Sequence, residues 1–248
     1  MSAVWLWQTN GLACIAQRVT RQDVRALILK FMESQVTGEK IHFPLIETER
    51  LTLRMLTADD LDAVYVLFND NDVQKHLSPA NRRTREQLKV TLGKLTLYWK
   101  ERGFGIWCIC LKDSKKVIGY CGFQYLDKTP QVEILFGFLK DYWGNGFATE
   151  AANACLRFGF EEAHCSKIFA TTLPENIASQ SVLEKIGMLF IKRAKYYQMD
   201  SIIFMVSCDQ YTPNKDFYKL SYENNHLIET KPKSVSVNRN SLFHFSLI

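Results

Sequence analysis

The residues whose types and spacing are most suggestive of chemistry form a turn of small residues in the second half of the chain. In the run Trp143-Gly144-Asn145-Gly146-Phe147-Ala148, glycine or alanine recurs at every second position. The run joins a segment with strand character to one with helix character, so bare main-chain N–H groups and the positive end of a helix dipole meet there. Small side chains let a charged group approach that backbone closely. The turn therefore predicts a site for an anion such as a pyrophosphate.

Other familiar ligand motifs are absent from the sequence. The turn lacks the third glycine of a dinucleotide fingerprint and the Gly-Lys-Ser/Thr of a Walker loop. The five histidines and seven cysteines show no metal-ligand spacing, and no C-x-x-C pair occurs, so we predict no metal site. Taken alone, the glycines could also serve the conformation of the turn and nothing else. The elements on either side of the turn are therefore needed to distinguish an anion site from a purely conformational role.

Strand and helix patterns alternate around the turn. The apolar stretch 132–139 precedes it as a strand, and 147–162 follows it as a helix. Segment 104–111 is apolar on both faces, as an internal strand should be. The other expected elements are strands at 50–54, 117–126, 167–173, 190–197 and 202–207, and a helix at 176–186. The order is β-α-α-β-β-β-α-β-α-β-β, which indicates an α/β (α+β) fold.

Two capping signals mark the starts of the first two helices. Thr57 is followed three residues later by Asp60, and Thr84 by Gln87, which is the spacing of a capping box. Gly103 is expected to end the second helix. Four large apolar residues recur at helical spacing along that helix and predict a buried stripe, namely Leu88, Leu92, Leu95 and Trp99.

The regular pattern occupies only part of the chain. Residues 1–46 form an N-terminal extension, with a hairpin turn expected at Asn10-Gly11 and a helix from about Val24 to Phe31. Residues 47–211 form the domain that carries the turn. Residues 212–248 are rich in Asn and Ser, with two prolines and little periodicity, and we expect a C-terminal tail of uncertain order.

Three motifs within 47–211 resemble those of the GNAT superfamily of N-acetyltransferases. The run 142–151 is similar to the coenzyme A turn of its RimJ/RimL-type branch, Pro174-Glu175-Asn176-Ile177-Ala178-Ser179 to its second motif, and 182–188 to its closing helix. The opening 47–54 is also typical of the branch. The resemblance implies a mixed, twisted sheet whose central parallel strands splay apart, with acetyl-CoA entering from one side and an amine acceptor from the other.

The resemblance also assigns the coenzyme to particular residues. Strand 132–139 would pair with the pantetheine arm through its main chain, the turn would hold the pyrophosphate, and Asn176 would reach the coenzyme or a water, unless it only caps its helix. The cofactor-binding residues so implied are Phe136, Gly137, Phe138, Trp143, Gly144, Asn145, Gly146, Phe147, Ala148, Thr149, Asn176 and Ser179.

Two departures from the family pattern bear on catalysis. Trp143 stands where the superfamily often has Gln or Arg, and Leu183 stands where many members place the tyrosine that protonates the departing thiolate. The branch resemblance offers Ser179 as the substitute acid, although a small polar residue there could also be only part of the first helical turn. For the base we select Glu133, acting directly or through a water. A solvated strand-end charge is the alternative for Glu133, and Glu175 and Asp200 are less favourable candidates.

Composition limits the partners. The formal net charge of +5 arises from scattered basic residues, so we do not expect nucleic acid as a partner, and no apolar run approaches the ~20 residues that cross a bilayer. We expect a cytoplasmic protein that transfers the acetyl group of acetyl-CoA to a protein N-terminus or a small-molecule amine, and a homodimer stays open. A non-catalytic acyl-CoA-binding regulatory module is the alternative, because the usual tyrosine is missing.

Overall fold

The structure of the protein is a computed structural model that describes residues 42–76, 82–127 and 129–224. The hairpin and helix expected near Asn10 and Val24 lie outside the described residues, as does the end of the expected tail from residue 225. No helix in the described part of the chain is long and apolar enough to cross a membrane.

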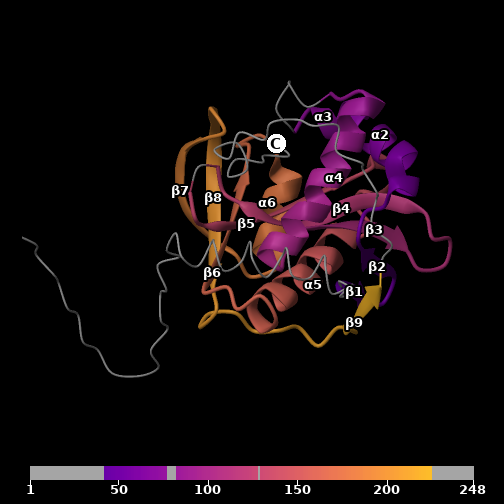
Figure 1. The fold of residues 1–248 in the computed structure, drawn as a ribbon. Helices are drawn as coiled ribbons and strands as arrows, with labels where there is room; N and C mark the ends of the chain where they lie inside the picture. Colours follow the sequence, from indigo (N-terminus) through magenta and orange to yellow (C-terminus); the bar gives the residue numbers. More distant parts are fainter. Residues whose placement is uncertain (1–41, 77–81, 128, 225–248) are drawn as a thin grey trace, which may run out of the picture. The chain divides into compact units, whose positions relative to one another are not determined.

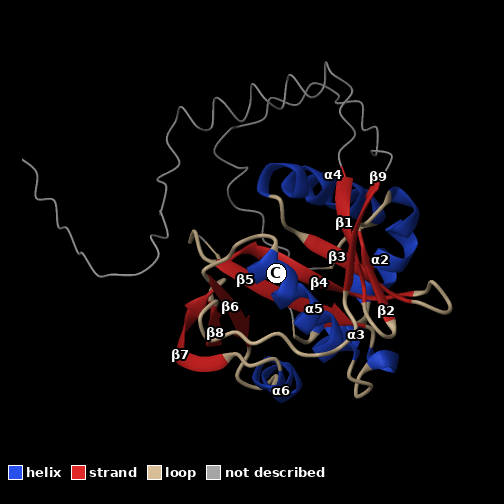
Figure 2. Ribbon diagram, turned by 90° about the horizontal axis from the view of Figure 1, so that it is seen from below, coloured by secondary structure: helices blue, strands red, loops and turns tan. Residues whose placement is uncertain are grey.

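Strands of the described region form one mixed sheet, which Figures 1 and 2 show from two directions. Its order is β7-β8-β6-β5-β4-β3-β2-β1-β9. Neighbours pair antiparallel except for β5 and β6, which pair parallel. The strands are β1 His42–Glu47, β2 Leu51–Arg54, β3 Ile106–Leu111, β4 Val117–Tyr125, β5 Val132–Phe138, β6 Lys167–Thr172, β7 Leu189–Tyr196, β8 Met199–Ser207 and β9 Lys219–Asn224.

The parallel pair β5 and β6 separates soon after it forms. Main-chain pairing joins Val132 to Ile168 and Glu133 to Phe169 and goes no further. From Ile134 onward β5 keeps its partner β4 on one edge, while no main-chain pairing joins its other edge to β6. The expectation of a mixed sheet with splayed central parallel strands is therefore confirmed.

Helices cover both faces of the sheet. Helix α5 (Phe147–Glu161) packs on one face with Trp107 and Ile109 of β3, whereas α2 (Leu61–Asn69) and α4 (Arg85–Arg102) pack on the other with Cys108 and Cys110. Figure 2 shows α4 and α6 (Ile177–Lys185) on opposite sides of the strands. Because alternate side chains of β3 enter different clusters, the expectation that this strand is internal and apolar on both faces is confirmed.

The capping signals differ in outcome. At α4 the Thr84 N–H donates to Gln87 Oε1 (2.8 Å) and the Gln87 N–H to Thr84 Oγ1 (3.2 Å), and Gly103 ends the helix at φ 72°, all as expected. The stripe from Leu88 to Trp99 is buried. At Thr57 the capping box also forms, with the Thr57 N–H donating to Asp60 Oδ2 (2.8 Å), but it caps a short 3-10 turn, Ala58–Asp60, and α2 begins only at Leu61. The sequence analysis also missed the single-turn helix α3 (Asn71–Gln74).

The sheet extends beyond the limits expected for the domain. Strand β1 lies largely before residue 47, and β9 lies inside the expected tail, where it pairs with β1 from His42 to Glu47. Pro44 obscured β1, because a proline inside a strand pattern argues against a central strand. The carbonyl oxygen of Pro44 nevertheless accepts a hydrogen bond from Trp107 Nε1 (2.9 Å), which ties β1 to the core.

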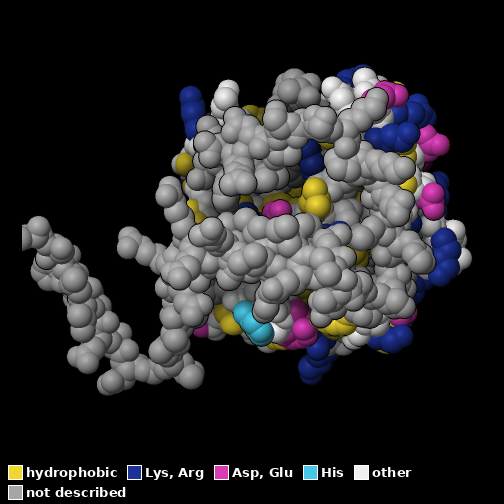
Figure 3. Space-filling model, viewed as in Figure 1, with side chains coloured by type: hydrophobic (Ala, Val, Ile, Leu, Met, Phe, Trp, Pro, Cys, Tyr) yellow, Lys and Arg dark blue, Asp and Glu magenta, His cyan; other side chains and the backbone are white. Residues whose placement is uncertain are grey.

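One face of the molecule is drawn as a space-filling view in Figure 3. Lys and Arg side chains appear at several separate places along its edges, with Asp and Glu side chains among them. The basic side chains visible on that face do not gather into one patch.

Candidate active site

A cavity of about 400 Å³ opens where β5 and β6 separate. It is bounded by β5, by the small-residue turn and by the first turn of α6. The cofactor-binding residues expected from the sequence that border it are Phe136, Gly137, Phe138, Trp143, Gly144, Gly146, Phe147, Ala148, Thr149, Asn176 and Ser179. Asn145 is the one expected residue that does not border it. The fold thus brings together segments that are about 45 residues apart in the sequence.

The geometry of the turn suits an anion. Gly144 and Gly146 have φ values of 76° and 78°, a left-handed backbone conformation that residues other than glycine rarely adopt. Gly146 is the N-cap of α5, and the first hydrogen bond of the helix runs from the Glu150 N–H to the Gly146 carbonyl oxygen (3.0 Å). The N–H groups of the preceding helical residues have no partner within the helix. They can therefore donate to a ligand in the cavity.

Trp143 joins the turn to the end of β5. Its indole Nε1–H donates to the Phe138 carbonyl oxygen (2.7 Å), and its ring lies 5.9 Å from that of His76. The tryptophan therefore supports the turn from the strand side, and the main-chain groups of the turn stay available for an anion.

Asn176 and Ser179 lie at the start of α6. Asn176 Oδ1 accepts a hydrogen bond from the Ser179 N–H (3.1 Å), so the capping interpretation of Asn176 is confirmed, and both residues border the cavity. Ser179 is half-buried. Leu183, one turn further along the helix, is fully buried and also borders the cavity. Helix α6 therefore contributes a half-buried hydroxyl, that of Ser179, and a buried apolar side chain, that of Leu183, to the lining of the cavity.

Glu133 is completely buried, which rules out the alternative of a solvated strand-end charge. Its Oε1 accepts a hydrogen bond from Thr171 Oγ1, and its Oε2 accepts from the Tyr197 hydroxyl (2.6 Å) and from Gln124 Nε2 (3.2 Å). Burial raises the pKa of the Glu133 carboxyl above its ordinary value, while the hydrogen bonds oppose that rise. Glu133 itself does not border the cavity, but Thr171 does. One hydroxyl group therefore separates the carboxylate from the cavity.

Tyr197 reaches Glu133 from the turn between β7 and β8. Tyr197 and Gln198 have φ values of 50° and 63°, which is unusual for bulky residues and suggests a local constraint. The Tyr197 hydroxyl accepts from the Asp127 N–H (2.9 Å), and the Tyr197 N–H donates to Asp127 Oδ2 (3.2 Å). Burial, together with the Glu133 charge, raises the pKa of the tyrosine. The hairpin turn is thus fixed over the carboxylate.

The two less favoured bases lie elsewhere. Asp200 pairs with Arg193, whose Nε and Nη2 lie 2.9 and 2.5 Å from Asp200 Oδ2, and this contact lowers the pKa of the aspartate. Glu175 is exposed. Neither residue borders the cavity.

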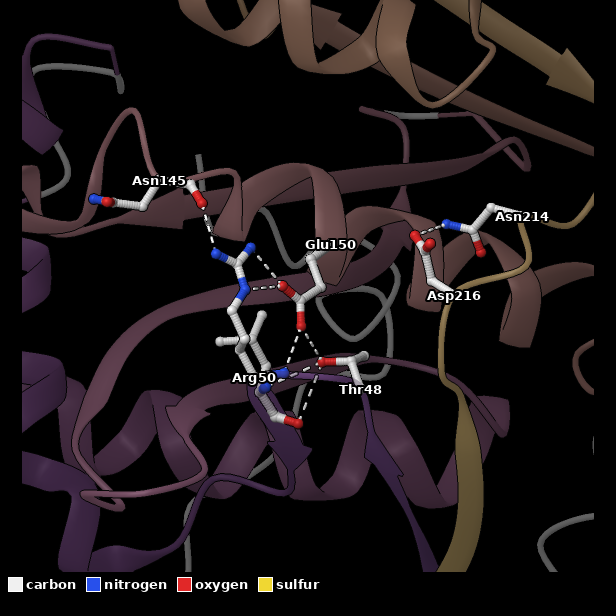
Figure 4. A network of polar contacts seen from close by, with 7 residues as sticks. Thr48, Arg50, Asn145, Glu150, Asn214 and Asp216 are labelled. Carbon is white, nitrogen blue, oxygen red and sulfur yellow. Dashed lines mark hydrogen bonds and ion pairs between the residues drawn. The ribbon is translucent and has the colours of Figure 1, made fainter.

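Sequence reasoning missed the partners of Glu133 and of Asn145. Thr171, Tyr197 and Gln124 come from three separate strands or turns, and no spacing pattern links them to Glu133. The sequence includes Arg50 in the opening run 47–54 that is typical of the branch, and no pattern there predicts a contact with Asn145. In the structure its Nη1 donates to the Asn145 carbonyl oxygen (2.9 Å), as Figure 4 shows.

Comparisons with known proteins agree with this geometry. The family model of the acetyltransferase (GNAT) domain matches residues 50–189. A relative from Bacillus subtilis, the uncharacterized N-acetyltransferase YoaA, is 33% identical over 147 residues, which cover 58% of this chain and 82% of the relative.

Solved structures share the fold. A GNAT-family acetyltransferase from Bacillus anthracis has a TM-score of 0.57 and 28% identity, with 66% of this chain and 99% of that chain covered. Spermidine N-acetyltransferase from Vibrio cholerae, solved with CoA and spermine, has a TM-score of 0.56 over 65% of this chain and 97% of that chain, and at 17% identity it supports the fold alone. With the family match over more than half of the chain, we conclude that this protein belongs to the GNAT family and is an N-acetyltransferase.

Proposed function

We propose that the protein transfers the acetyl group of acetyl-CoA to a primary amine, by direct attack of the amine on the thioester. The observation that carries this proposal is the cavity at the separation of β5 and β6. The small-residue turn borders it, and Thr171, which also borders it, donates a hydrogen bond to the buried Glu133 carboxylate. Acetyl-CoA supplies an activated acetyl group. The chain has to bind it, orient it and remove a proton from the acceptor.

Binding is assigned to the main chain. The first N–H groups of α5 would hold the pyrophosphate, and the edge of β5 that lacks a β6 partner would pair with the pantetheine arm. A main-chain N–H of β5 would also stabilise the thioester oxygen as it becomes negative. These roles require no particular side chain at Trp143, so the departure from the family pattern there does not weaken them.

Proton transfer is assigned to two side chains. Glu133, with a raised pKa and no exposure, suits a base that accepts the proton of the acceptor through the Thr171 hydroxyl or a water. Ser179, which borders the cavity, suits the donor for the departing thiolate, in place of the tyrosine that Leu183 replaces. The motifs of the turn and of α6 favour the RimJ/RimL-type branch, which includes N-terminal acetyltransferases of ribosomal proteins, so a protein N-terminus and a small-molecule amine are both candidate acceptors.

Activity is measured with a panel of acceptors, and coenzyme A binding is measured by calorimetric titration. The protein is incubated with acetyl-CoA and a panel of acceptors: peptides with a free N-terminus, spermine and amino sugars. Free thiol and the mass of each acceptor are then followed. We expect thiol release matched by an acetyl mass shift on one class of acceptor. Coenzyme A binding without thiol release from any acceptor would instead favour the non-catalytic module.

A further inference from the structure

Arg50 lies against the small-residue turn although it is almost a hundred residues away in the sequence. Its Nη1 donates to the Asn145 carbonyl oxygen (2.9 Å), and its Nε and Nη2 lie 2.7 and 2.6 Å from Glu150 Oε2. Figure 4 shows the guanidinium group between the turn and the first turn of α5. One planar group therefore joins the turn to the helix that follows it.

Further contacts fix this arrangement. Thr48 Oγ1 and the Arg50 N–H donate to Glu150 Oε1 (2.7 and 2.8 Å), so both carboxylate oxygens are occupied. The guanidinium carbon lies 4.5 Å from the centre of the Phe147 ring. Nη2 is 3.5 Å from the position that a Cβ atom on Gly146 would occupy. Arg50 therefore contacts Asn145, Phe147 and Glu150 and lies beside Gly146.

The bond to Asn145 determines the direction of the next N–H group. In a planar trans peptide the C=O and the following N–H point in opposite directions. When Arg50 holds the Asn145 carbonyl oxygen, the Gly146 N–H must point away from Arg50. Rotation of this peptide changes the ψ of Asn145 and the φ of Gly146, and glycine adopts positive and negative φ at similar cost. Without Arg50, the carbonyl oxygen could turn toward an anion and repel it.

The ion pair with Glu150 reduces a second unfavourable interaction with a bound anion, which comes from the charge of the Glu150 carboxylate. Glu150 lies in the first turn of α5, at the helix end that is assigned to the pyrophosphate. Its negative charge would repel the negative charges of the phosphates. The side chain of Glu150 is only 11% exposed, so water screens it poorly. The guanidinium charge compensates this carboxylate.

We propose that Arg50 is a positioning residue for the coenzyme. It holds the Asn145–Gly146 peptide in the orientation that presents its N–H to the pyrophosphate, and it neutralises Glu150. This inference rests on the proposed function of the turn. It requires the planar fork of arginine, because a lysine ammonium cannot bond to the Asn145 carbonyl and to the carboxylate in the same way.

Calorimetric titration with coenzyme A tests the proposal. Arg50→Gln should weaken coenzyme A binding by roughly tenfold, the scale of a charge interaction at a helix end. Arg50→Lys keeps the charge but loses the bond to the Asn145 carbonyl oxygen, so it should weaken binding measurably, though less than Arg50→Gln. The matched control is Arg85→Gln, because Arg85 also pairs with a carboxylate, that of Asp62 (2.9 Å), and lies over an aromatic ring, that of Tyr65 (4.1 Å). It should leave the affinity unchanged.

A double variant separates a positioning role from simple loss of structure. In Arg50→Gln the Glu150 charge is uncompensated, so adding Glu150→Gln should restore part of the lost affinity. Wild-type affinity in Arg50→Lys, an equal loss in Arg85→Gln, or a double variant that binds no better than Arg50→Gln would each overturn the proposal. Failure of the wild-type protein to bind coenzyme A would refute the proposed function itself, which is a different result.

Discussion

Replacing Tyr197 with phenylalanine removes one hydroxyl group from the surroundings of the Glu133 carboxylate. That hydroxyl donates to Glu133 Oε2 (2.6 Å) and stabilises the ionised form of the carboxyl. Its loss should therefore raise the pKa of Glu133 further above the ordinary value. More of the carboxyl is then protonated near neutral pH, where it cannot act as a base, so the rate should fall there and recover as the pH rises.

The size of the effect follows from the hydrogen bond. A hydrogen bond to a charged group contributes about 1.5–3 kcal/mol, and 1.36 kcal/mol corresponds to a factor of ten in a protonation equilibrium. The acid limb of the pH–rate profile should thus move by about one to two pH units to higher pH. Water that enters the space left by the hydroxyl would reduce the shift toward the lower figure.

The assay is the acetyl transfer rate at saturating acetyl-CoA, measured over a range of pH with the acceptor identified by mass shift. Tyr98→Phe is the matched control. The Tyr98 hydroxyl accepts from the Tyr125 N–H (3.1 Å), as the Tyr197 hydroxyl accepts from the Asp127 N–H, but no hydrogen bond links it to Glu133. Both variants lose an acceptor for a main-chain N–H, and only Tyr197→Phe should shift the profile. An unshifted profile in Tyr197→Phe, or an equal shift in Tyr98→Phe, would refute the reasoning.

Three further outcomes are expected. Glu133→Gln should remove the ionisation from the pH–rate profile and lower the rate near neutral pH by at least about tenfold, and a profile like that of the wild type would exclude Glu133 as the base. Because the pKa of Glu133 is raised on folding, its contribution to stability is present below the ordinary carboxyl pKa and is lost as pH rises through the folded value. In denaturant titrations at several pH values, Glu133→Gln should therefore gain stability relative to the wild type as pH rises, whereas a constant difference would argue against the raised pKa. Ser179→Ala should lower turnover by roughly ten- to a hundredfold with little change in coenzyme affinity, and an equal loss of affinity would make Ser179 structural.

Much of the fold was predictable because local patterns matched their tertiary surroundings. Segment 104–111 is apolar throughout, and the structure places α5 against one face of it and α2 and α4 against the other. The capping box at Thr84 and Gly103 at the helix end involve residues close together in the sequence. Strands β1 and β9 were not recognised, because β1 contains Pro44 and β9, at the edge of the sheet, pairs with β1 alone among the described strands.

The candidate site was predictable where the chain itself forms it. The turn 143–148 and the start of α6 are local, and the residues selected from them border the cavity, apart from Asn145. Burial of Glu133 was not predictable, because it depends on Gln124, Thr171 and Tyr197, which the fold brings together from distant segments. The bond from Arg50 to Asn145 spans 95 residues and left no local pattern in the sequence.

The most direct test of the central claim is calorimetric titration of Gly146→Glu and Gly146→Ala with coenzyme A. Gly146 has a φ of 78°, so both substitutions impose the same backbone strain, but only glutamate adds a negative charge to the turn to which the pyrophosphate is assigned, starting from a Cβ position 3.5 Å from Arg50 Nη2. The wild-type protein should bind, Gly146→Ala should bind more weakly, and Gly146→Glu should not bind measurably while its circular dichroism stays native. Native affinity for coenzyme A in a folded Gly146→Glu variant would contradict the account, because the phosphates would then have to bind elsewhere.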